Sequence, residues 1–231
     1  MRKSNLFLGA VILVSLLILV IYGIAALSPI NPKPKNVGDE ETTVTPLDKP
    51  TLSYGNPSKG PRDAKVIVTV FGDYLCQPCA EFEGETAVLL AEFPKDVRLV
   101  WKDMPNQSLH SGSINAAVAA RCAGDQGAFW QYHDLLMTQQ ASINEKNFVP
   151  FAAQLGLDLE SFQTCYDGKL TQPLVQRDYD EGQRLRVSST PYTFVGARRV
   201  EGAVSYEQLR GFVLAALSEA GVTPDTNAPR P

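Results

Sequence analysis

The pair of cysteines in Cys76-Gln77-Pro78-Cys79 constrains this chain more than any other feature of its sequence. An apolar, β-branched run at residues 66–71 precedes the pair and a helical pattern follows it, so the pair stands where a strand passes into a helix. Unpaired backbone N–H groups and the positive end of the helix dipole favour a thiolate there. We therefore expect Cys76 to attack disulfides, and Cys79, one turn further along, to resolve the mixed disulfide.

The same spacing of two cysteines occurs in zinc ribbons, which need a second pair of ligands to complete the site. The sequence contains no second pair of this kind. Cys122 and Cys165 stand alone, and His110 and His133 have no ligand-like spacing. We therefore interpret the motif as a redox centre and predict neither a metal ion nor another cofactor. His133, which has aromatic neighbours, is expected to be a packed histidine rather than a catalytic one.

The N-terminus predicts a membrane anchor. Arg2 and Lys3 precede residues 6–27, a run of 22 residues without a charge, which is long enough to span a bilayer and longer than the core of a signal peptide. The positive-inside rule leaves the N-terminus in the cytoplasm and the rest of the chain outside, where disulfides persist. A cleaved signal peptide is the alternative, because small residues around Ala25 offer a poor cleavage site.

Composition divides the chain into four segments. Residues 1–27 form the predicted signal-anchor, and residues 28–61, rich in proline and poor in large apolar side chains, are expected to be a flexible tether. Residues 62–221 have the length of one domain with a well-buried core, and residues 222–231 are predicted to be a disordered tail. The net charge of −4, without a clustered basic face, argues against a nucleic-acid partner.

Hydrophobic periodicity predicts a mixed α/β fold. Two strands that flank a helix form a β-α-β unit, a run of helical patterns follows, and a β-hairpin and a last helix complete the order. A capping box at Ser205 and Gln208 marks the start of the last helix, and Gly221 marks its end. The predicted segments are strand 66–71, helix 79–93, strand 97–101, a helical insertion at about 108–188, strands 192–195 and 199–201, and helix 205–221.

With this order of elements, the chain resembles the DsbA-like family of exported thiol-disulfide oxidoreductases, in which a helical domain interrupts a thioredoxin fold. The resemblance covers roughly residues 52–220. It implies a central mixed sheet flanked by helices, an inserted all-helical domain and, given the anchor, a membrane-tethered member of the family. The motifs that carry it are Cys76-Gln77-Pro78-Cys79 followed by Phe82 and Glu83, the run from Ala120 to Asp134, and Thr190-Pro191 ahead of Tyr192.

The resemblance also implies partners and a location. Exported cysteine-containing proteins would be the substrates, a membrane redox partner would reoxidise or reduce the pair, and the N-terminal helix would contact the lipid bilayer. The expected location is the bacterial cell envelope, with a single span in the inner membrane and the catalytic domain on the extracytoplasmic side. Disulfide isomerisation, reduction for one dedicated pathway, and a non-catalytic binding or chaperone module are the alternatives.

The resemblance further implies a cis peptide bond at Thr190-Pro191, facing the thiol pair. The Thr190 backbone would then be free to pair with a substrate strand bound in an apolar groove near Pro191. Gln77 and Pro78, between the cysteines, are expected to tune the redox potential. Strongly oxidising members carry a histidine where this chain carries Pro78, so the net direction of electron transfer stays open.

Three acidic residues flank the thiol pair, and one of them is a candidate to carry a proton to or from Cys79 in the resolving step. Glu83 best fits the family position, with Asp73 and Glu81 as alternatives. The competing interpretation is that all three are solvated charges on the first helical turn or in the loop.

Cys122 and Cys165 fall on apolar helix faces, since Cys122 follows Val118 by four residues and Cys165 follows Phe162 by three. In an exported protein we expect the two cysteines to form a structural disulfide between helices of the insertion. Two separate buried thiols are the alternative.

Overall fold

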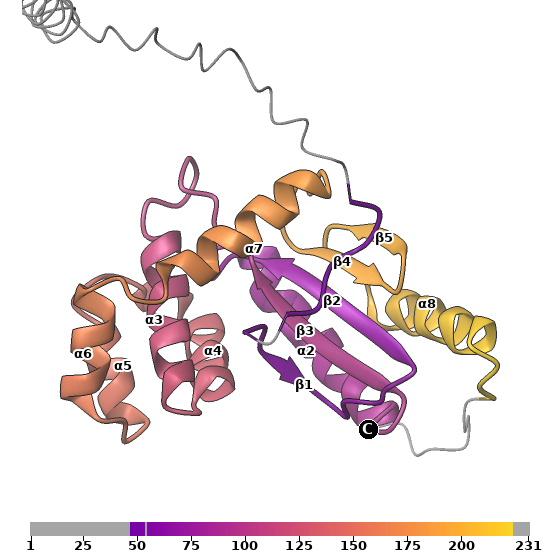
Figure 1. Cartoon of the computed structure of the whole chain (residues 1–231), viewed down its shortest axis with the longest axis horizontal. Coiled ribbons are helices and arrows are strands. Elements are labelled where there is room, and N and C mark those ends of the chain that lie inside the picture. Colours follow the sequence, from indigo (N-terminus) through magenta and orange to yellow (C-terminus); the bar gives the residue numbers. More distant parts are fainter. Residues whose placement is uncertain (1–46, 54, 224–231) are drawn as a thin grey trace, which may run out of the picture. The chain divides into compact units, whose positions relative to one another are not determined.

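The computed structural model describes residues 47–53 and 55–223. The predicted signal-anchor at 1–27, most of the predicted tether and the tail from residue 224 onward lie outside these residues. Within the described part of the chain, no helix has the length and the apolar character needed to cross a membrane. The described residues form a five-stranded sheet with helices on both faces and a further group of helices beside it (Figure 1).

The sheet is mixed, as predicted. β2 (Val66–Gly72) and β3 (Val97–Asp103) pair in parallel and are joined by α2 (Gln77–Glu92), which makes the β-α-β unit. β4 (Tyr192–Val195) pairs antiparallel with β2, and β5 (Arg198–Glu201) forms a hairpin with β4. The strand order is β1-β3-β2-β4-β5, with β1 (Ser58–Lys59) antiparallel to β3 at one edge.

Alternating side chains of β2 contribute to two apolar layers. Its three valines lie in the main core, which α2 and α8 (Tyr206–Glu219) cover from one face of the sheet. Phe71 points to the other face, into a smaller cluster beneath α7 (Gln172–Arg184). There α7 approaches so closely that a Cβ at Gly182 would lie 2.6 Å from the sulfur of Met104, and the Met104 side chain would have to shift to admit it. The sheet is thus enclosed on both faces.

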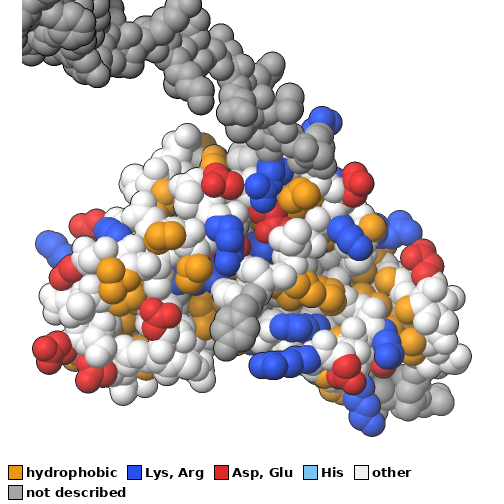
Figure 2. Space-filling view, in the orientation of Figure 1, with side chains coloured by type: hydrophobic (Ala, Val, Ile, Leu, Met, Phe, Trp, Pro, Cys, Tyr) orange, Lys and Arg blue, Asp and Glu red, His pale blue; other side chains and the backbone are white. Residues whose placement is uncertain are grey.

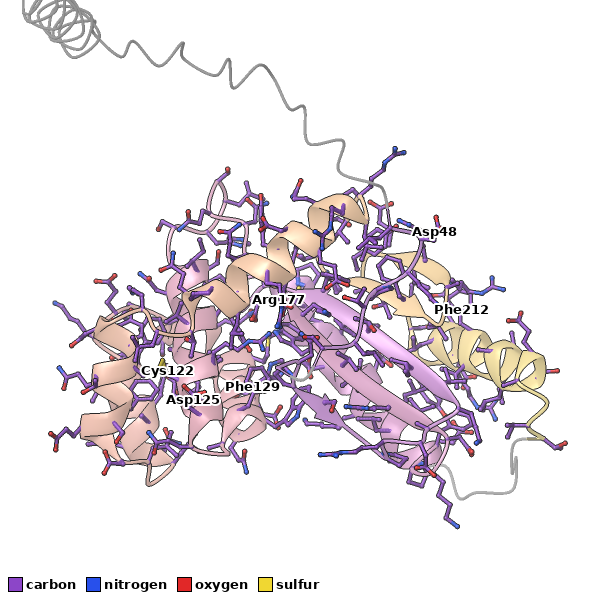
Figure 3. All side chains as sticks on the ribbon, viewed as in Figure 1. Asp48, Cys122, Asp125, Phe129, Arg177 and Phe212 are labelled. Carbon is purple, nitrogen blue, oxygen red and sulfur yellow. A yellow bond between two sulfur atoms is a disulfide. The ribbon has the colours of Figure 1, made fainter. Side chains whose placement is uncertain are left out.

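The helical insertion is present between β3 and β4. Its remaining elements are α3 (Ser113–Asp125), α4 (Phe129–Thr138), the short 3-10 helix η1 (Gln140–Ser142), α5 (Phe148–Gln154) and α6 (Leu159–Asp167). The helices from α3 to α6 pack against one another beside the sheet, whereas α7 also contacts β3 (Figure 1). Cys122 on α3 and Cys165 on α6 form a disulfide with their Cα atoms 5.8 Å apart. Figure 3 shows Cys122 among these helices, away from the sheet.

The prediction of a flexible tether through residue 61 is wrong for its last part. β1 lies within that segment, and upstream of it the Thr51 hydroxyl donates to Oε1 of Glu181 at 2.9 Å. The amide of Asn56 donates to Oδ1 of Asp178 at 3.0 Å. The segment has few apolar side chains to bury, but its polar groups satisfy buried carboxylates of α7, which are distant in the sequence. Further upstream, the Leu47 backbone N–H donates to the Arg184 carbonyl at 3.4 Å, so the contacts of the folded domain extend back at least to residue 47 rather than beginning at 62.

These carboxylates belong to a network of buried charges that holds the insertion against the sheet. Arg121 on α3 contacts Asp103 on β3 and Asp178 on α7, with N–O distances of 2.7 and 2.5 Å. Lys102 on β3 reaches Glu181 on α7 at 2.6 Å. All five side chains are at most 3% exposed, and burial raises the pKa of Asp103. On the outer face drawn in Figure 2, by contrast, acidic, basic and small apolar groups are interspersed.

Candidate active site

The cysteine pair stands at the junction of β2 and α2. β2 ends at Gly72, and a tight turn follows in which the Cys76 backbone N–H donates to the Asp73 carbonyl at 3.1 Å. Cys76 is the extended N-cap residue of α2, so the helix starts at Gln77, two residues before the predicted start. Pro78 fits this first turn because its missing N–H would have no helical partner there. The thiol of Cys76 therefore lies at the positive end of the helix dipole.

Cys76 is the readily ionised member of the pair. Its side chain is 6% exposed, and its Sγ lies 3.3 Å from the carbonyl oxygen of Thr190. A hydrogen bond with the Cys79 side chain lowers the pKa of Cys76 to about 6, against the opposing effect of burial, and a further hydrogen bond with Thr190 supports the shift. Because the thiolate is the attacking form, this pKa makes Cys76 nucleophilic at neutral pH.

Cys79 has the opposite character. It lies one turn into α2 and is 2% exposed, and burial above all raises the pKa of its thiol, with the hydrogen bond to Cys76 adding to the effect. The two cysteines are free thiols in this structure. The opposite shifts suit the predicted division of roles, in which Cys76 attacks as a thiolate and Cys79 resolves once it has lost its proton, and these roles stay a prediction.

The segment before β4 forms the other side of the site. The Thr190-Pro191 peptide bond is cis, and β4 begins at the next residue. β4 pairs antiparallel with β2, and Tyr192 lies opposite Phe71 at the end of β2. This register brings the start of β4 beside the turn that carries Cys76. The Thr190 carbonyl consequently faces the Cys76 sulfur, and Pro191 is buried next to it.

A cavity of about 450 Å³ lies next to Thr190, between α7 and the loop that follows β3. The expectation of an apolar groove at this place is wrong in part. Met104, Ile114 and Val175 do line the cavity, but amide and hydroxyl side chains share its wall. The polar lining includes Asn106, Gln107, Gln172, Gln176, Gln183 and Ser189. A bound chain would meet hydrogen-bonding groups there as well as apolar ones.

Glu83 turns toward the insertion. Its Oε1 lies 3.3 Å from Nε2 of His133, whose Nδ1 lies 3.1 Å from the Tyr74 hydroxyl. His133 is fully buried among aromatic rings, as predicted for a packed histidine. Glu83, His133 and Asp134 offer ligand atoms within 4.8 Å of one another, but Asp134 already pairs with Lys59 at 3.3 Å. A proton relay from Glu83 to Cys79 stays a prediction.

The remaining residues around the motif divide into exposed and buried ones. The dipeptide between the cysteines is exposed, and the Gln77 amide donates to Glu81 at 3.0 Å. Asp73, by contrast, is 1% exposed; it accepts from the Asn106 backbone at 2.8 Å and contacts Nδ1 of His110 at 3.0 Å. The interpretation of Asp73 as a solvated charge is therefore wrong, because the loop after β3 folds over it.

One residue at the site has no signal in the sequence. Gln140, in η1, donates its side-chain amide to the backbone carbonyls of Tyr74 and Cys76, each at 2.9 Å. A glutamine more than 60 residues from the cysteines fits no local motif, and only the packing of the insertion beside α2 reveals the contact.

Together, a thiol pair at the start of a helix and a cis-proline segment facing it define a thioredoxin-type redox site. The family profile described as Thioredoxin matches residues 52–215, and the chain belongs to that family. A thioredoxin-like oxidoreductase from Silicibacter pomeroyi DSS-3 is 30% identical with a TM-score of 0.66, over 72% of this chain and 94% of that one. The thiol-disulfide exchange protein alpha-DsbA2 from Wolbachia pipientis shares the fold at 19% identity and a TM-score of 0.63, over 70% and 87% of the two chains.

A curated relative extends well beyond the matched region. The Na(+)/H(+) antiporter NhaA 1 of Salinispora arenicola is 35% identical over 166 residues, which is 72% of this chain and 25% of that protein. The chain thus spans about a quarter of that relative's length, and the transport named there is not carried over. Fold and family make this chain a member of the thioredoxin family, and the fold that the resemblance to DsbA-like proteins implied is confirmed.

Proposed function

We propose that the protein is an exported, membrane-tethered oxidoreductase that forms or exchanges disulfides in extracytoplasmic proteins through Cys76 and Cys79. The observation that carries the proposal is the geometry of Cys76, whose sulfur combines a lowered pKa with a position 3.3 Å from the Thr190 carbonyl. A strand-like substrate segment that pairs with the Thr190 backbone would bring its own cysteine to the Cys76 sulfur.

The reaction is two successive exchanges. In the oxidising direction, a substrate thiolate attacks Sγ of Cys76 in the Cys76–Cys79 disulfide, and Cys79 leaves and takes up a proton. A second substrate thiolate then attacks the substrate sulfur of the mixed disulfide and releases Cys76 as a thiolate. Two electrons pass from the substrate dithiol to the protein pair, and a substrate disulfide forms. Reduction is the same sequence in reverse.

Some groups at the site favour oxidation of the substrate, and others favour its reduction. Stabilisation of the Cys76 thiolate favours the reduced protein and hence its use as an oxidant. The charge of Asp73 acts against that stabilisation. Pro78 also occupies the place that a histidine has in strongly oxidising members of the DsbA-like family that the chain resembles. A disulfide isomerase or a pathway-specific reductase is therefore the second candidate, and the Asp73 effect is the observation that favours it.

The location and partners of the proposal follow from the sequence. The uncharged run at residues 6–27 supports a single span in the inner membrane of a bacterial envelope, with the domain on the extracytoplasmic side. Exported cysteine-containing proteins are the proposed substrates. A membrane protein that reoxidises or reduces the pair is the proposed redox partner. Each turnover changes the oxidation state of the pair, which must be restored before the next turnover.

The test is the reduction potential of the Cys76–Cys79 pair in the full-length chain in detergent, equilibrated against glutathione and trapped with acid. A potential near the roughly −120 mV of a strong oxidant supports a disulfide donor. A potential near the roughly −270 mV of thioredoxin overturns oxidation and leaves the reductase. If Cys76 reacts with iodoacetamide at mildly acidic pH no faster than an ordinary thiol, the fold serves a non-catalytic binding module instead.

A further inference from the structure

Gln140 holds the turn that carries the redox pair. Its side-chain nitrogen lies 2.9 Å from the carbonyl oxygen of Tyr74 and 2.9 Å from that of Cys76. Because both partners are acceptors, the amide must present its NH2 group, and both of its hydrogens are used. The residue belongs to η1, so a helical element of the insertion directly contacts the backbone of the attacking cysteine.

The Cys76 carbonyl accepts three hydrogen bonds. It accepts from the backbone N–H of Cys79 at 3.0 Å and of Ala80 at 3.3 Å, in addition to the Gln140 amide. Carbonyl oxygens carry partial negative charge, and those of Tyr74 and Cys76 belong to the same turn as the thiolate. Donors on these oxygens offset that charge, and they also fix the turn from which the Cys76 sulfur reaches Thr190.

We infer that Gln140 is a positioning residue through which the helical insertion sustains the reactivity of Cys76. The inference rests on the proposed redox role of the pair. Without the amide, each of the two carbonyls loses one donor that offsets its effect on the thiolate. The turn is then held by its own backbone and by the Asp73 carboxylate, without a hydrogen bond to η1. The Cys76 pKa then rises, the reduced protein becomes less favoured, and the reduction potential becomes more negative.

The insertion contains a matched control. Gln126, at the end of α3, also uses its side-chain amide for two hydrogen bonds with backbone: its nitrogen donates to the Asp158 carbonyl at 3.0 Å, and its oxygen accepts from the Asp158 N–H at 2.9 Å. This pair joins α3 to the start of α6 and involves no residue of the redox turn. Replacing Gln126 with alanine removes the same number of hydrogen bonds as Gln140→Ala without touching the site, whereas Gln126→Glu removes only the donated bond.

The experiment compares Gln140→Ala, Gln140→Glu, Gln126→Ala and Gln126→Glu in the full chain, in detergent. The readouts are the iodoacetamide reaction of Cys76 as a function of pH, the reduction potential and the melting temperature. We expect Gln140→Ala to slow alkylation at pH 6 by roughly two- to fivefold, the size that loss of ordinary hydrogen bonds supports. Gln140→Glu should slow it more, since a carboxylate keeps the shape of the amide but faces two carbonyls without a donor.

The order of the two Gln140 variants distinguishes positioning from packing. If the side chain acts only through its shape, Glu is milder than Ala, which overturns the inference. Equal pH profiles for the Gln140 and Gln126 variants overturn it as well. If Cys76 of the unsubstituted protein reacts with the pH profile of an ordinary thiol, the proposed function itself is overturned. If that thiol is acidic but the Gln140 variants leave its pH profile unchanged, only the role of Gln140 is overturned.

Discussion

The two cysteine pairs of this protein are equally buried and differ in their chemistry. The side chains of Cys76 and Cys79 are 6% and 2% exposed, and those of Cys122 and Cys165 are 1% and 7% exposed. Yet the first pair is present as free thiols with strongly shifted pKa values, and the second is a disulfide. Burial alone therefore does not decide whether a cysteine is reactive or structural.

The position of each cysteine along its helix explains the difference. Cys76 caps the N-terminus of α2, where the helix dipole and its hydrogen bonds favour a thiolate. Cys122 and Cys165 both lie in the last turn of their helices, α3 and α6, where the negative end of the dipole disfavours a thiolate. The first pair can therefore exchange, whereas the second pair is placed to stay oxidised and to join two helices.

Removing one sulfur of the redox pair should produce the largest effect. Cys76→Ser is expected to reduce catalysed thiol-disulfide exchange to the rate of a protein-free solution, because no other described thiol is ionised at neutral pH. Cys79→Ser should keep the first attack and accumulate a mixed disulfide on Cys76. Mass spectrometry after incubation with oxidised glutathione measures both outcomes. Equal adduct formation on Cys79 in the Cys76→Ser variant would contradict the assigned roles.

Removing the second pair should cost stability and leave reactivity unchanged. The double variant Cys122→Ala, Cys165→Ala opens a loop that spans a sequence separation of 43 residues, which contributes about 4 kcal/mol in the chain-entropy model. We expect the melting temperature to fall by roughly 10 °C. The rate of Cys76 alkylation at pH 7, corrected for the unfolded fraction, serves as the control. A large change in that rate would show that the two pairs are coupled.

The third prediction concerns the pH dependence of stability, for which we expect a smaller effect that comes from the redox pair alone. The pKa of Cys76 is lowered from 9.0 to about 6, so its ionisation stabilises the reduced folded protein fully above pH 9, and this stabilisation is lost as the pH falls through 6. Between these values, the free energy of unfolding of the reduced protein should rise relative to Cys76→Ser, by less than about 4 kcal/mol. Chemical denaturation at several pH values measures the difference.

The control for the pH prediction is the oxidised protein, in which Cys76 has no proton to lose. The difference in free energy of unfolding between the oxidised protein and the Cys76→Ser variant should stay constant over the same pH range. A flat difference for the reduced protein as well would mean that the thiol of Cys76 is not acidic in the folded chain.

How much of this could be predicted depends on how local each feature is. The strand-helix junction, the hairpin and the capping box of α8 depend on neighbouring residues, and the periodicity of the sequence predicts them. The strand β1 was missed because two polar residues carry no pattern, and it is held by contacts with β3. The network around Arg121 was missed for the same reason, since its partners lie 18 and 57 residues away.

The same distinction applies to the site. The cysteines and Thr190-Pro191 could be identified because their spacing and neighbours form motifs. Gln140 and the burial of Asp73 could not, because each depends on which loop folds over the turn before α2. The groove next to Thr190 was expected to be apolar, but α7 places glutamines along it as well as valine.

Glu83 gives the smallest expected effect and sharpens the comparison within the redox pair. Its carboxylate faces His133 at 3.3 Å and its side chain is 18% exposed, so we expect Glu83→Gln to slow the resolving attack by Cys79 by less than about tenfold. Quenched-flow release of a mixed disulfide from Cys76 isolates that step, and the alkylation rate of Cys76 should stay unchanged. A loss of about 10² or more, confined to resolution, would instead establish Glu83 as the proton relay for Cys79.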